Sequence, residues 1–325
     1  MKSETYAREI LPLFPENLRA HLAKELNSTR GVEEIRLGVG KPIFLYCGGV
    51  ERVVAEGPKQ EPYLANREDI AKVLQTVSRY SLYAFEEELR HGYITVPGGH
   101  RVGLTGKAVL EGGRVKRICS ISSLNIRIAR QILGAANPLL PSLFEGKSRR
   151  LYHTLIISPP KKGKTTLLRD IARNLSYGSS LIKPLRVGIV DERSELSGCF
   201  QGVPQLDVGL RTDVLDACPK AEGMMMLIRA MGPDVIITDE IGREEDVFAL
   251  REALNAGVVV ISSAHARSFT ELKGRPVFKK ILAEKFFQRF VVLGSSRGTG
   301  TVEMILDENG NSLKQEGWMR CSSQK

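Results

Sequence analysis

The second half of the chain contains short apolar runs separated by stretches with helical spacing. The runs begin at Leu151, Leu185, Asp234, Gly257 and Arg289, and they read L-Y-H-T-L-I-I, L-R-V-G-I-V-D-E, D-V-I-I-T-D-E, G-V-V-V-I-S-S-A-H and R-F-V-V-L. Strands of a parallel sheet have this continuous apolar character because both faces of the sheet are covered. Since such strands alternate with helices here, we predict a doubly wound α/β domain over residues 150–325.

The first part of the chain, residues 1–135, combines helical periodicity with hairpin signals. Between residues 68 and 89, apolar residues recur at the spacing of an amphipathic helix, at Ile70, Val73, Leu74 and Val77. Further on, alternating apolar and polar runs flank two glycine-containing breaks at residues 97–99 and 111–113, and the first break predicts a β-hairpin. We therefore expect an N-terminal α+β domain.

The segment between these two parts is rich in residues that interrupt regular structure. Residues 134–149 contain two prolines and two glycines. We therefore place a linker or hinge at residues 136–149, with a short helix around Leu139 to Phe144. The predicted order is an N-terminal α+β domain, this linker and the C-terminal α/β domain.

Composition narrows the class of protein. Hydrophobic residues make up 42% and charged residues 26% of the 325 residues, which argues against a disordered chain. No apolar run approaches the roughly 20 residues needed to span a bilayer, and the first ten residues carry acids where a signal peptide needs an apolar stretch. Five scattered cysteines without a C-x-x-C pattern argue against a disulfide framework or a zinc site. We expect a cytoplasmic protein.

Basic residues exceed acidic residues by ten, 47 against 37, and such an excess can indicate a polyanionic partner. The excess is spread evenly, because residues 1–135 carry 20 basic and 15 acidic residues and the remainder carries 27 and 22. No stretch of the sequence interleaves aromatic and basic residues as nucleic-acid-binding motifs do. A mildly basic solvated surface explains the same excess, and a nucleic-acid partner is the less favoured interpretation.

The strand from Leu151 leads into I-S-P-P-K-K-G-K-T-T, which is close to the phosphate-binding pattern G-x-x-x-x-G-K-[ST]. The following residues have helical periodicity, so strand, loop and helix occur in the order that this motif requires. In such a loop, backbone N–H groups and the helix N-terminus surround the phosphates of ATP. The predicted nucleotide-binding residues are Ser158, Pro159, Pro160, Lys161, Lys162, Gly163, Lys164, Thr165 and Thr166.

Within this loop, Lys164 is expected to reach the β- and γ-phosphates and the Thr165 hydroxyl to hold Mg²⁺. Ser158 stands where the pattern has its first glycine. If that position needs a positive φ, the serine costs about 1–2 kcal/mol. Lys161 and Lys162 place additional charge beside a triphosphate, where they either strengthen binding or obstruct closure of the loop.

Polar residues follow the other predicted strands at their carboxyl ends, where open parallel sheets bind ligands. Asp239 and Glu240 end one strand, with Asp239 suited to Mg²⁺ and Glu240 suited to act as general base towards water. Glu192 and His265 end two others. The alternative for the acidic pair is a helix cap, and for His265 a loop histidine with a backbone partner. His153, inside the first strand, is predicted to be a core histidine.

Together these segments resemble the type II/IV secretion ATPase superfamily. The resemblance rests on I-S-P-P-K-K-G-K-T-T-L-L-R-D, V-D-E-R-S-E, G-L-R-T-D-V-L, P-D-V-I-I-T-D-E-I-G-R-E-E-D and A-G-V-V-V-I-S-S-A-H. E-E-E-L-R-H-G-Y-I-T-V-P-G-G-H-R-V-G-L-T-G and I-S-S-L-N-I-R-I-A-R in the first domain are similar to a sporulation branch of that superfamily. The implied fold is a P-loop NTPase (RecA/AAA+-like) sheet.

The resemblance implies an ATPase of the mother cell that energises a secretion-like channel into the forespore. It implies a hexameric ring docked on the membrane proteins of that channel complex, with Glu240 catalytic, Glu192 in the "Asp box" and His265 sensing the nucleotide. Members of the superfamily also bring N-terminal arginines to the γ-phosphate. The candidates by position, each of which could instead be a surface arginine, are Arg101, Arg127 and Arg130, with Arg211 in the ATPase domain.

These observations lead us to expect Mg²⁺-dependent attack of water on the γ-phosphate of ATP, with hydrolysis driving motion between the two domains. Two alternatives stay open. The positive charge leaves room for a nucleic-acid motor. The altered phosphate loop leaves room for a nucleotide-gated scaffold with negligible hydrolysis.

Overall fold

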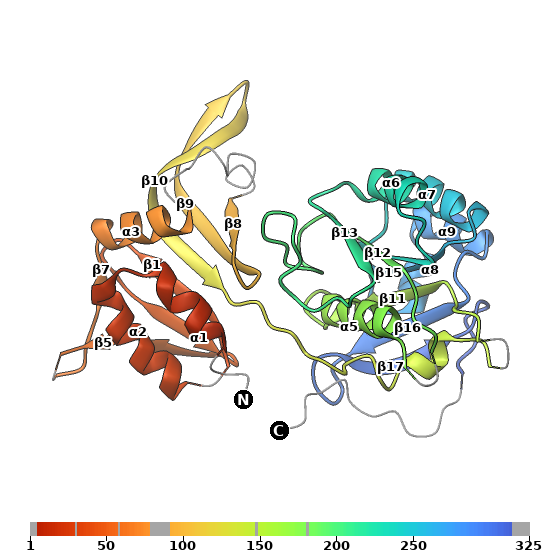
Figure 1. Ribbon diagram of the computed structural model, residues 1–325, viewed down its shortest axis with the longest axis horizontal. Coiled ribbons are helices and arrows are strands. Elements are labelled where there is room, and N and C mark those ends of the chain that lie inside the picture. The colour runs from red at the N-terminus through yellow and green to blue at the C-terminus, as the bar shows by residue number, and fades with distance from the viewer. Residues whose placement is uncertain are drawn as a thin grey trace. The chain divides into compact units, whose positions relative to one another are not determined.

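The computed structural model describes residues 5–29, 31–57, 59–78, 92–146, 149–179 and 182–313. The chain forms two compact units, Met1–Arg130 and Gln131–Lys325, each with its own elements (Figure 1). Among the described residues, no helix combines the length and the hydropathy needed to cross a membrane.

The boundary between the units differs from the one expected from sequence. It falls after Arg130, and residues 136–149, which we expected to form a linker, belong to the second unit. Ala136, Leu139 and Leu143 are buried in that unit's core. The backbone N–H groups of Gly134 and Ala136 donate to the buried Asp170 carboxylate at 3.1 and 2.8 Å. Apolar burial and these hydrogen bonds fix the segment, and its expected short helix is a 3₁₀ turn.

The first unit is built around an antiparallel sheet. Its helical elements are α1 (Thr5–Ile10), η1 (Leu11–Leu13), α2 (Glu16–Ser28) and α3 (Arg67–Val77). Its strands are β1 (Val32–Gly38), β2 (Lys41–Pro42), β3 (Phe44–Cys47), β4 (Val50–Val53), β5 (Ala55–Glu56), β6 (Glu61–Pro62), β7 (Leu64–Ala65), β8 (Tyr93–Val96), β9 (His100–Glu111) and β10 (Arg114–Arg127). The main sheet has the order β4-β3-β1-β10-β9-β8, with every neighbouring pair antiparallel.

Local sequence explains much of this unit. The turn at residues 97–99 joins β8 to β9 with Val96 opposite His100, so the predicted hairpin is confirmed. The predicted helix begins with a capping box between Asn66 and Asp69 and is described as α3 to Val77. The remainder of that prediction, from residue 79 to 89, lies outside the described residues.

Alternation along the strands gives the sheet two different faces. One face packs its apolar residues against the helices in a single core, as Leu37, Leu45 and Leu124 do with Leu18 of α2. The intervening residues lie on the other face, because successive side chains of a strand point to opposite sides. That second face carries polar and aromatic side chains.

The second unit is a parallel sheet wound with helices. Its helical elements are η3 (Leu140–Leu143), α5 (Lys164–Tyr177), α6 (Lys220–Ala230), α7 (Glu244–Asn255), α8 (Phe269–Lys273) and α9 (Pro276–Ala283). Its strands are β11 (Thr154–Ser158), β12 (Val187–Asp191), β13 (Thr212–Asp216), β14 (Val235–Glu240), β15 (Val259–His265), β16 (Arg289–Gly294) and β17 (Thr301–Leu306). The order is β13-β12-β14-β15-β11-β16-β17, and only β17 runs antiparallel to its neighbour.

Two apolar clusters cover the two faces of this sheet, which confirms the doubly wound α/β prediction. One cluster contains Leu168 and Ile171 of α5, and the other contains Met224 of α6 and Leu250 of α7. The five apolar runs of the sequence correspond to β11, β12, β14, β15 and β16. The strands β13 and β17 were not predicted, because these edge strands are only partly buried and lack a continuous apolar run.

His153, just before β11, is a core histidine as predicted. Its side chain is 8% exposed, and its Nδ1 accepts the backbone N–H of Val260 at 3.2 Å. Burial, with a smaller contribution from Arg150, lowers the pKa of His153 from 6.5 to about 4. The neutral imidazole therefore joins the start of β11 to the start of β15.

This histidine should make the second unit sensitive to acid. The unfolded chain takes up a proton near pH 6.5 and the folded chain only near pH 4, so stability is lost as pH falls through that window. We expect the free energy of unfolding to drop by about 2 kcal/mol between pH 7 and pH 5 from this group alone. In His153→Asn, the free energy of unfolding should drop less between pH 7 and pH 5. Hydrogen exchange of the strand amides measures this free energy in both proteins. An identical pH dependence in both proteins would contradict this assignment.

Candidate nucleotide-binding site

The site lies at the carboxyl ends of three neighbouring strands, β11, β15 and β14. Ser158 at the end of β11 pairs with His265 at the end of β15, and Glu240 at the end of β14 pairs with Ser263 of β15. Parallel pairing brings these strand ends to one edge of the sheet. The loop that follows β11, residues 159–163, connects directly to α5.

The amino end of α5 is open to an anion. Its N-cap is Gly163, with φ of 87°, and no side chain caps the helix there. The first N–H groups of a helix have no intrahelical acceptors, and the helix dipole places partial positive charge on them. A Cβ at Gly163 would come within 3.3 Å of Gly300 Cα, so only glycine lets the loop approach the β16–β17 connection this closely.

The strain in the loop falls on a different residue from the one expected. Ser158 is an ordinary strand residue and is absent from the residues with positive φ, whereas Lys161 has φ of 60°. The predicted cost of about 1–2 kcal/mol therefore belongs to Lys161. Lys162 Nζ donates to Ser295 Oγ at 2.9 Å, which ties this lysine to the β16–β17 connection.

Lys164 is buried at the centre of the site. Its Nζ donates to the carbonyl oxygens of Ser158 at 3.1 Å and Pro159 at 3.0 Å, and it lies 2.8 Å from His265 Nδ1. Three acceptors match the three N–H groups of an ammonium. Burial lowers the pKa of Lys164 to about 8, and the Glu240 carboxylate opposes this shift. The ammonium is therefore still predominantly charged at pH 7.

His265 connects this lysine to Glu240. Its Nε2 lies 3.0 Å from Glu240 Oε2. Because Nδ1 faces an ammonium and must accept, the proton of the neutral ring belongs on Nε2, which donates to Glu240. The result is a continuous chain from Lys164 at the start of α5 through His265 at the end of β15 to Glu240 at the end of β14. His265 thus contacts both Lys164 and Glu240, and its Nδ1 also lies near the Ser158 carbonyl oxygen at 3.4 Å.

Asp239 has the properties of a site for a divalent cation. Its Oδ1 is buried and has no hydrogen-bond partner among the described residues. Burial, reinforced by Asp191, Glu192 and Glu195 against the opposing charge of Lys220, raises the pKa of Asp239 to about 7. The described residues contain no group of three or more candidate ligands of the His, Cys, Asp and Glu types. The buried, unpartnered carboxylate oxygen of Asp239 fits Mg²⁺, which usually keeps several waters and one or two carboxylates.

Glu192 belongs to a group of charged side chains close to Asp239. It is paired with the buried Lys220, and its other oxygen lies 3.6 Å from Arg243. Lys220 Nζ is also 4.0 Å from Asp239 Oδ1. Glu192, Asp239 and Glu240 all line a cavity of about 390 Å³, and the start of α9 lines it as well.

Two residues that organise this region were not identified from the sequence. Lys220 holds Glu192 and faces Asp239, and Arg169 donates to the carbonyl oxygens of Glu195 and Leu196. Their local sequences give no signal of such roles, because Lys220 only follows a proline at the start of a helix and Arg169 only lies within one. Asp191 accepts the N–H groups of Glu195 and Ser197 at 2.8 and 2.7 Å, so it fixes the loop after β12.

The four arginines predicted from the resemblance do not join the site within their own units. Arg211 precedes β13 at the amino edge of the sheet, opposite to the phosphate loop, and it donates to the Ser176 carbonyl oxygen at 3.1 Å. The other three belong to the first unit. Arg101 lies over the Tyr93 ring, Arg127 is exposed on β10, and Arg130 Nη1 donates to Glu33 at 3.2 Å.

The strand order, the loop between β11 and α5, and the acidic end of β14 define the fold of a P-loop NTPase. Two solved structures share this fold. The Legionella pneumophila ATPase DotB has a TM-score of 0.53 at 17% identity, covering 86% of this chain and 76% of that one. The pilus retraction motor PilT, solved with bound ADP, has a TM-score of 0.55 at 16% identity, covering 87% and 77%.

Sequence comparison gives the family. Residues 4–313 match the family model described as sporulation stage III, protein AA. The stage III sporulation protein AA of Bacillus subtilis (strain 168) is 48% identical over 308 residues, which are 94% of this chain and 97% of that protein. The chain belongs to the stage III sporulation protein AA family.

The left-handed backbone at Lys161 gives a direct test of the loop geometry. We expect Lys161→Gly to raise the free energy of unfolding by about 0.5–1 kcal/mol, because relief of strain exceeds the entropy cost of glycine. Lys162→Gly is the matched control and should lower it by about 1 kcal/mol, since φ there is ordinary and the bond to Ser295 is lost. Thermal unfolding measures both. Equal effects of the two substitutions would contradict the loop conformation.

Proposed function

We propose that this protein is a Mg²⁺-dependent ATPase that acts as the motor of a membrane-associated sporulation complex. The observation that supports this most is the chain Lys164–His265–Glu240, at 2.8 and 3.0 Å, beside the open amino end of α5. It places a phosphate-binding ammonium and a candidate base one histidine apart. Such an arrangement suits hydrolysis of a terminal phosphate.

The proposed roles follow from these positions. The N–H groups of the loop and α5 bind the β- and γ-phosphates together with Lys164, and Glu240 takes a proton from the attacking water. Thr165 and Asp239 are the residues that would hold Mg²⁺. When bound, Mg²⁺ would neutralise charge on the phosphate oxygens. Glu192 supports Asp239 indirectly, through their shared neighbour Lys220.

His265 is proposed to report whether nucleotide is present. All three N–H groups of Lys164 already have protein acceptors, so a phosphate oxygen must replace at least one of them. If the phosphate oxygen replaces His265 as an acceptor, His265 Nδ1 is freed and the hydrogen bonding of the ring to Glu240 changes. Binding at the loop is thereby linked to the position of the base.

The family and the shared fold support a proposal for the assembly. We propose a homo-oligomeric ring, a hexamer, docked on membrane proteins of a channel complex between mother cell and forespore. The fold is shared with DotB, an ATPase, and PilT, a pilus retraction motor. In this proposal Arg101, Arg127 or Arg130 reaches the γ-phosphate, and hydrolysis changes the arrangement of the two units.

Turnover measurements test the chemistry. Glu240→Gln should lower ATP hydrolysis about 10²–10⁴-fold while ATP still binds, because it removes the base and keeps the loop. Lys164→Ala should remove both binding and hydrolysis. The matched control is Glu245→Gln, an exposed carboxylate in the first turn of α7, which should leave turnover unchanged. Equal low rates in wild type, Lys164→Ala and Glu240→Gln, with ATP binding retained in wild type, would favour a nucleotide-gated scaffold.

Small-angle scattering tests the proposed motion. In Glu240→Gln, saturating Mg²⁺ and ATP should change the distance distribution relative to the nucleotide-free protein, because bound ATP is not consumed. The same addition to Lys164→Ala should leave the distribution unchanged. Identical profiles with and without ATP in Glu240→Gln, under conditions where ATP is shown to bind, would contradict the motion.

A further inference from the structure

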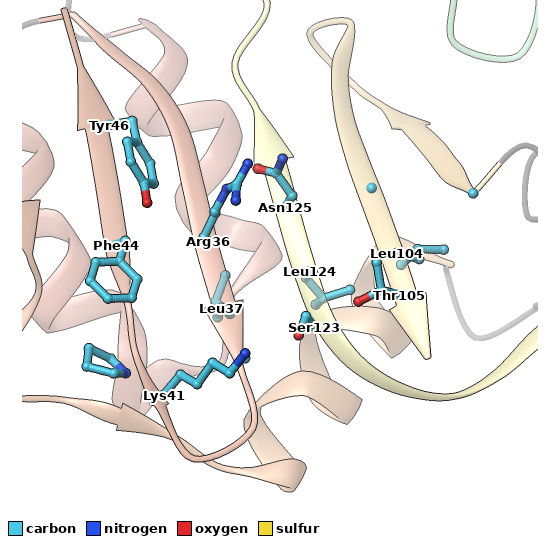
Figure 2. A pocket seen from close by; sticks show the side chains of 14 residues that line it. Arg36, Leu37, Lys41, Phe44, Tyr46, Leu104, Thr105, Ser123, Leu124 and Asn125 are labelled. Carbon is cyan, nitrogen blue, oxygen red and sulfur yellow. The ribbon is translucent and has the colours of Figure 1, made fainter. Parts of the chain in front are cut away.

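A second cavity, of about 540 Å³, lies in the first unit and has no role in the function proposed above. It occupies the face of the antiparallel sheet that points away from the helical core. Figure 2 shows Arg36 and Asn125 at one end, Lys41 and Ser123 at the other, and the rings of Phe44 and Tyr46 along one wall. A volume of this size is typical of small-molecule sites.

Strand register brings these residues together from distant parts of the sequence. Arg36 of β1 lies between Phe44 of β3 and Asn125 of β10, and Asn125 in turn faces Gly103 of β9. Basic, aromatic and amide side chains therefore interleave across the sheet, although they do not interleave along the chain. Sheets that stack planar rings on such aromatic side chains commonly bind nucleotides.

Gly103 keeps the floor of the cavity open. Its backbone does not require glycine, because its φ is not positive, and a Cβ there would meet only ordinary contacts, the nearest being Asn125 O at 3.6 Å. A side chain would thus be tolerated by the fold but would fill space beside Asn125. A substitution at Gly103 can therefore test whether a ligand occupies the cavity without disturbing the sheet.

The charge in the cavity suits an anion. Among the described residues, Arg36 and Lys41 line it and no carboxylate does. Glu34 pairs with Arg36 from beside the cavity, and the Arg36 guanidinium lies 5.5 Å from the centre of the Tyr46 ring. An arginine held between a carboxylate and an aromatic ring is oriented to bind a planar or phosphorylated ligand.

Asn125 adds a requirement for a hydrogen-bond donor. Its Oδ1 is buried and has no partner among the described residues. A buried amide oxygen without a donor is costly, and a ligand N–H would remove that cost. The ligand should therefore combine a flat ring, an N–H donor and an anionic group.

We infer that this cavity binds a nucleoside monophosphate, with the base against Phe44 and Tyr46 at the end that holds Arg36, a base N–H donating to Asn125, and the phosphate held by Lys41 at the other end. The inference is independent of the phosphate loop, because a monophosphate lacks the β- and γ-phosphates that Lys164 is proposed to bind. A free nucleotide fits a volume of about 540 Å³, whereas a longer nucleic acid would have to extend beyond it.

Calorimetric titration of full-length Lys164→Ala with AMP and with GMP tests the inference. We expect saturable binding of at least one of them. Arg36→Ala, Asn125→Ala and Gly103→Ala, each added to Lys164→Ala, should weaken it at least about tenfold. The matched control is Lys107→Ala, an exposed lysine on β9 outside the cavity, which should leave the affinity unchanged. If Asn125→Ala fails to fold, Gly103→Ala carries the test.

Three results would overturn the inference. The first is absence of saturable binding by either monophosphate at millimolar concentration. The second is binding that Gly103→Ala and Arg36→Ala leave unchanged. The third is tight binding of a short single-stranded RNA through the same residues without binding of monophosphates, which would make the surface a nucleic-acid interface. None of these results bears on ATP binding at Lys164, which is measured separately in the wild-type protein.

Discussion

A buried ammonium requires an acceptor for each of its N–H groups, and the site of the second unit is organised around meeting that requirement at Lys164. Two acceptors are carbonyl oxygens of the loop that the lysine itself closes, at Ser158 and Pro159, and the third is His265 on the next strand. His265 then fixes the direction of Glu240 on β14. Lys164, His265 and Glu240 are therefore coupled through single hydrogen bonds, so a phosphate that took one bond from Lys164 would alter the whole chain.

The two units place their sites differently because their sheets are built differently. In the second unit, helices cover both faces of a parallel sheet, which leaves the strand ends as the accessible edge. In the first unit, helices cover one face of an antiparallel sheet, and the other face carries Arg36, Asn125 and their neighbours. One chain thus offers an edge site suited to a triphosphate and a face site suited to a smaller anion.

From the sequence, residues at the ends of strands could be placed at one edge of the sheet, whereas contacts that depend on packing between elements could not be predicted. Glu240 and His265 were predicted because each ends an apolar run, and Lys164 because the loop after such a run is close to a phosphate-binding pattern. The parallel fold brings these positions together. Lys220 gave no signal, since its pairing with Glu192 exists only after α6 packs beside β12. Arg211 was a candidate from the resemblance alone, and its sequence does not reveal that it precedes β13 at the amino edge of the sheet. The cavity of the first unit could not be predicted from the sequence, because it depends on the register of several strands.

The central claim is that the ends of β11, β15 and β14 together hold a nucleoside triphosphate. Equilibrium binding of ATP to the purified protein, with and without Mg²⁺, addresses it most directly. The account predicts saturable binding that Mg²⁺ strengthens and that Lys164→Ala abolishes. Absence of any magnesium-dependent affinity for ATP or another nucleoside triphosphate would contradict it.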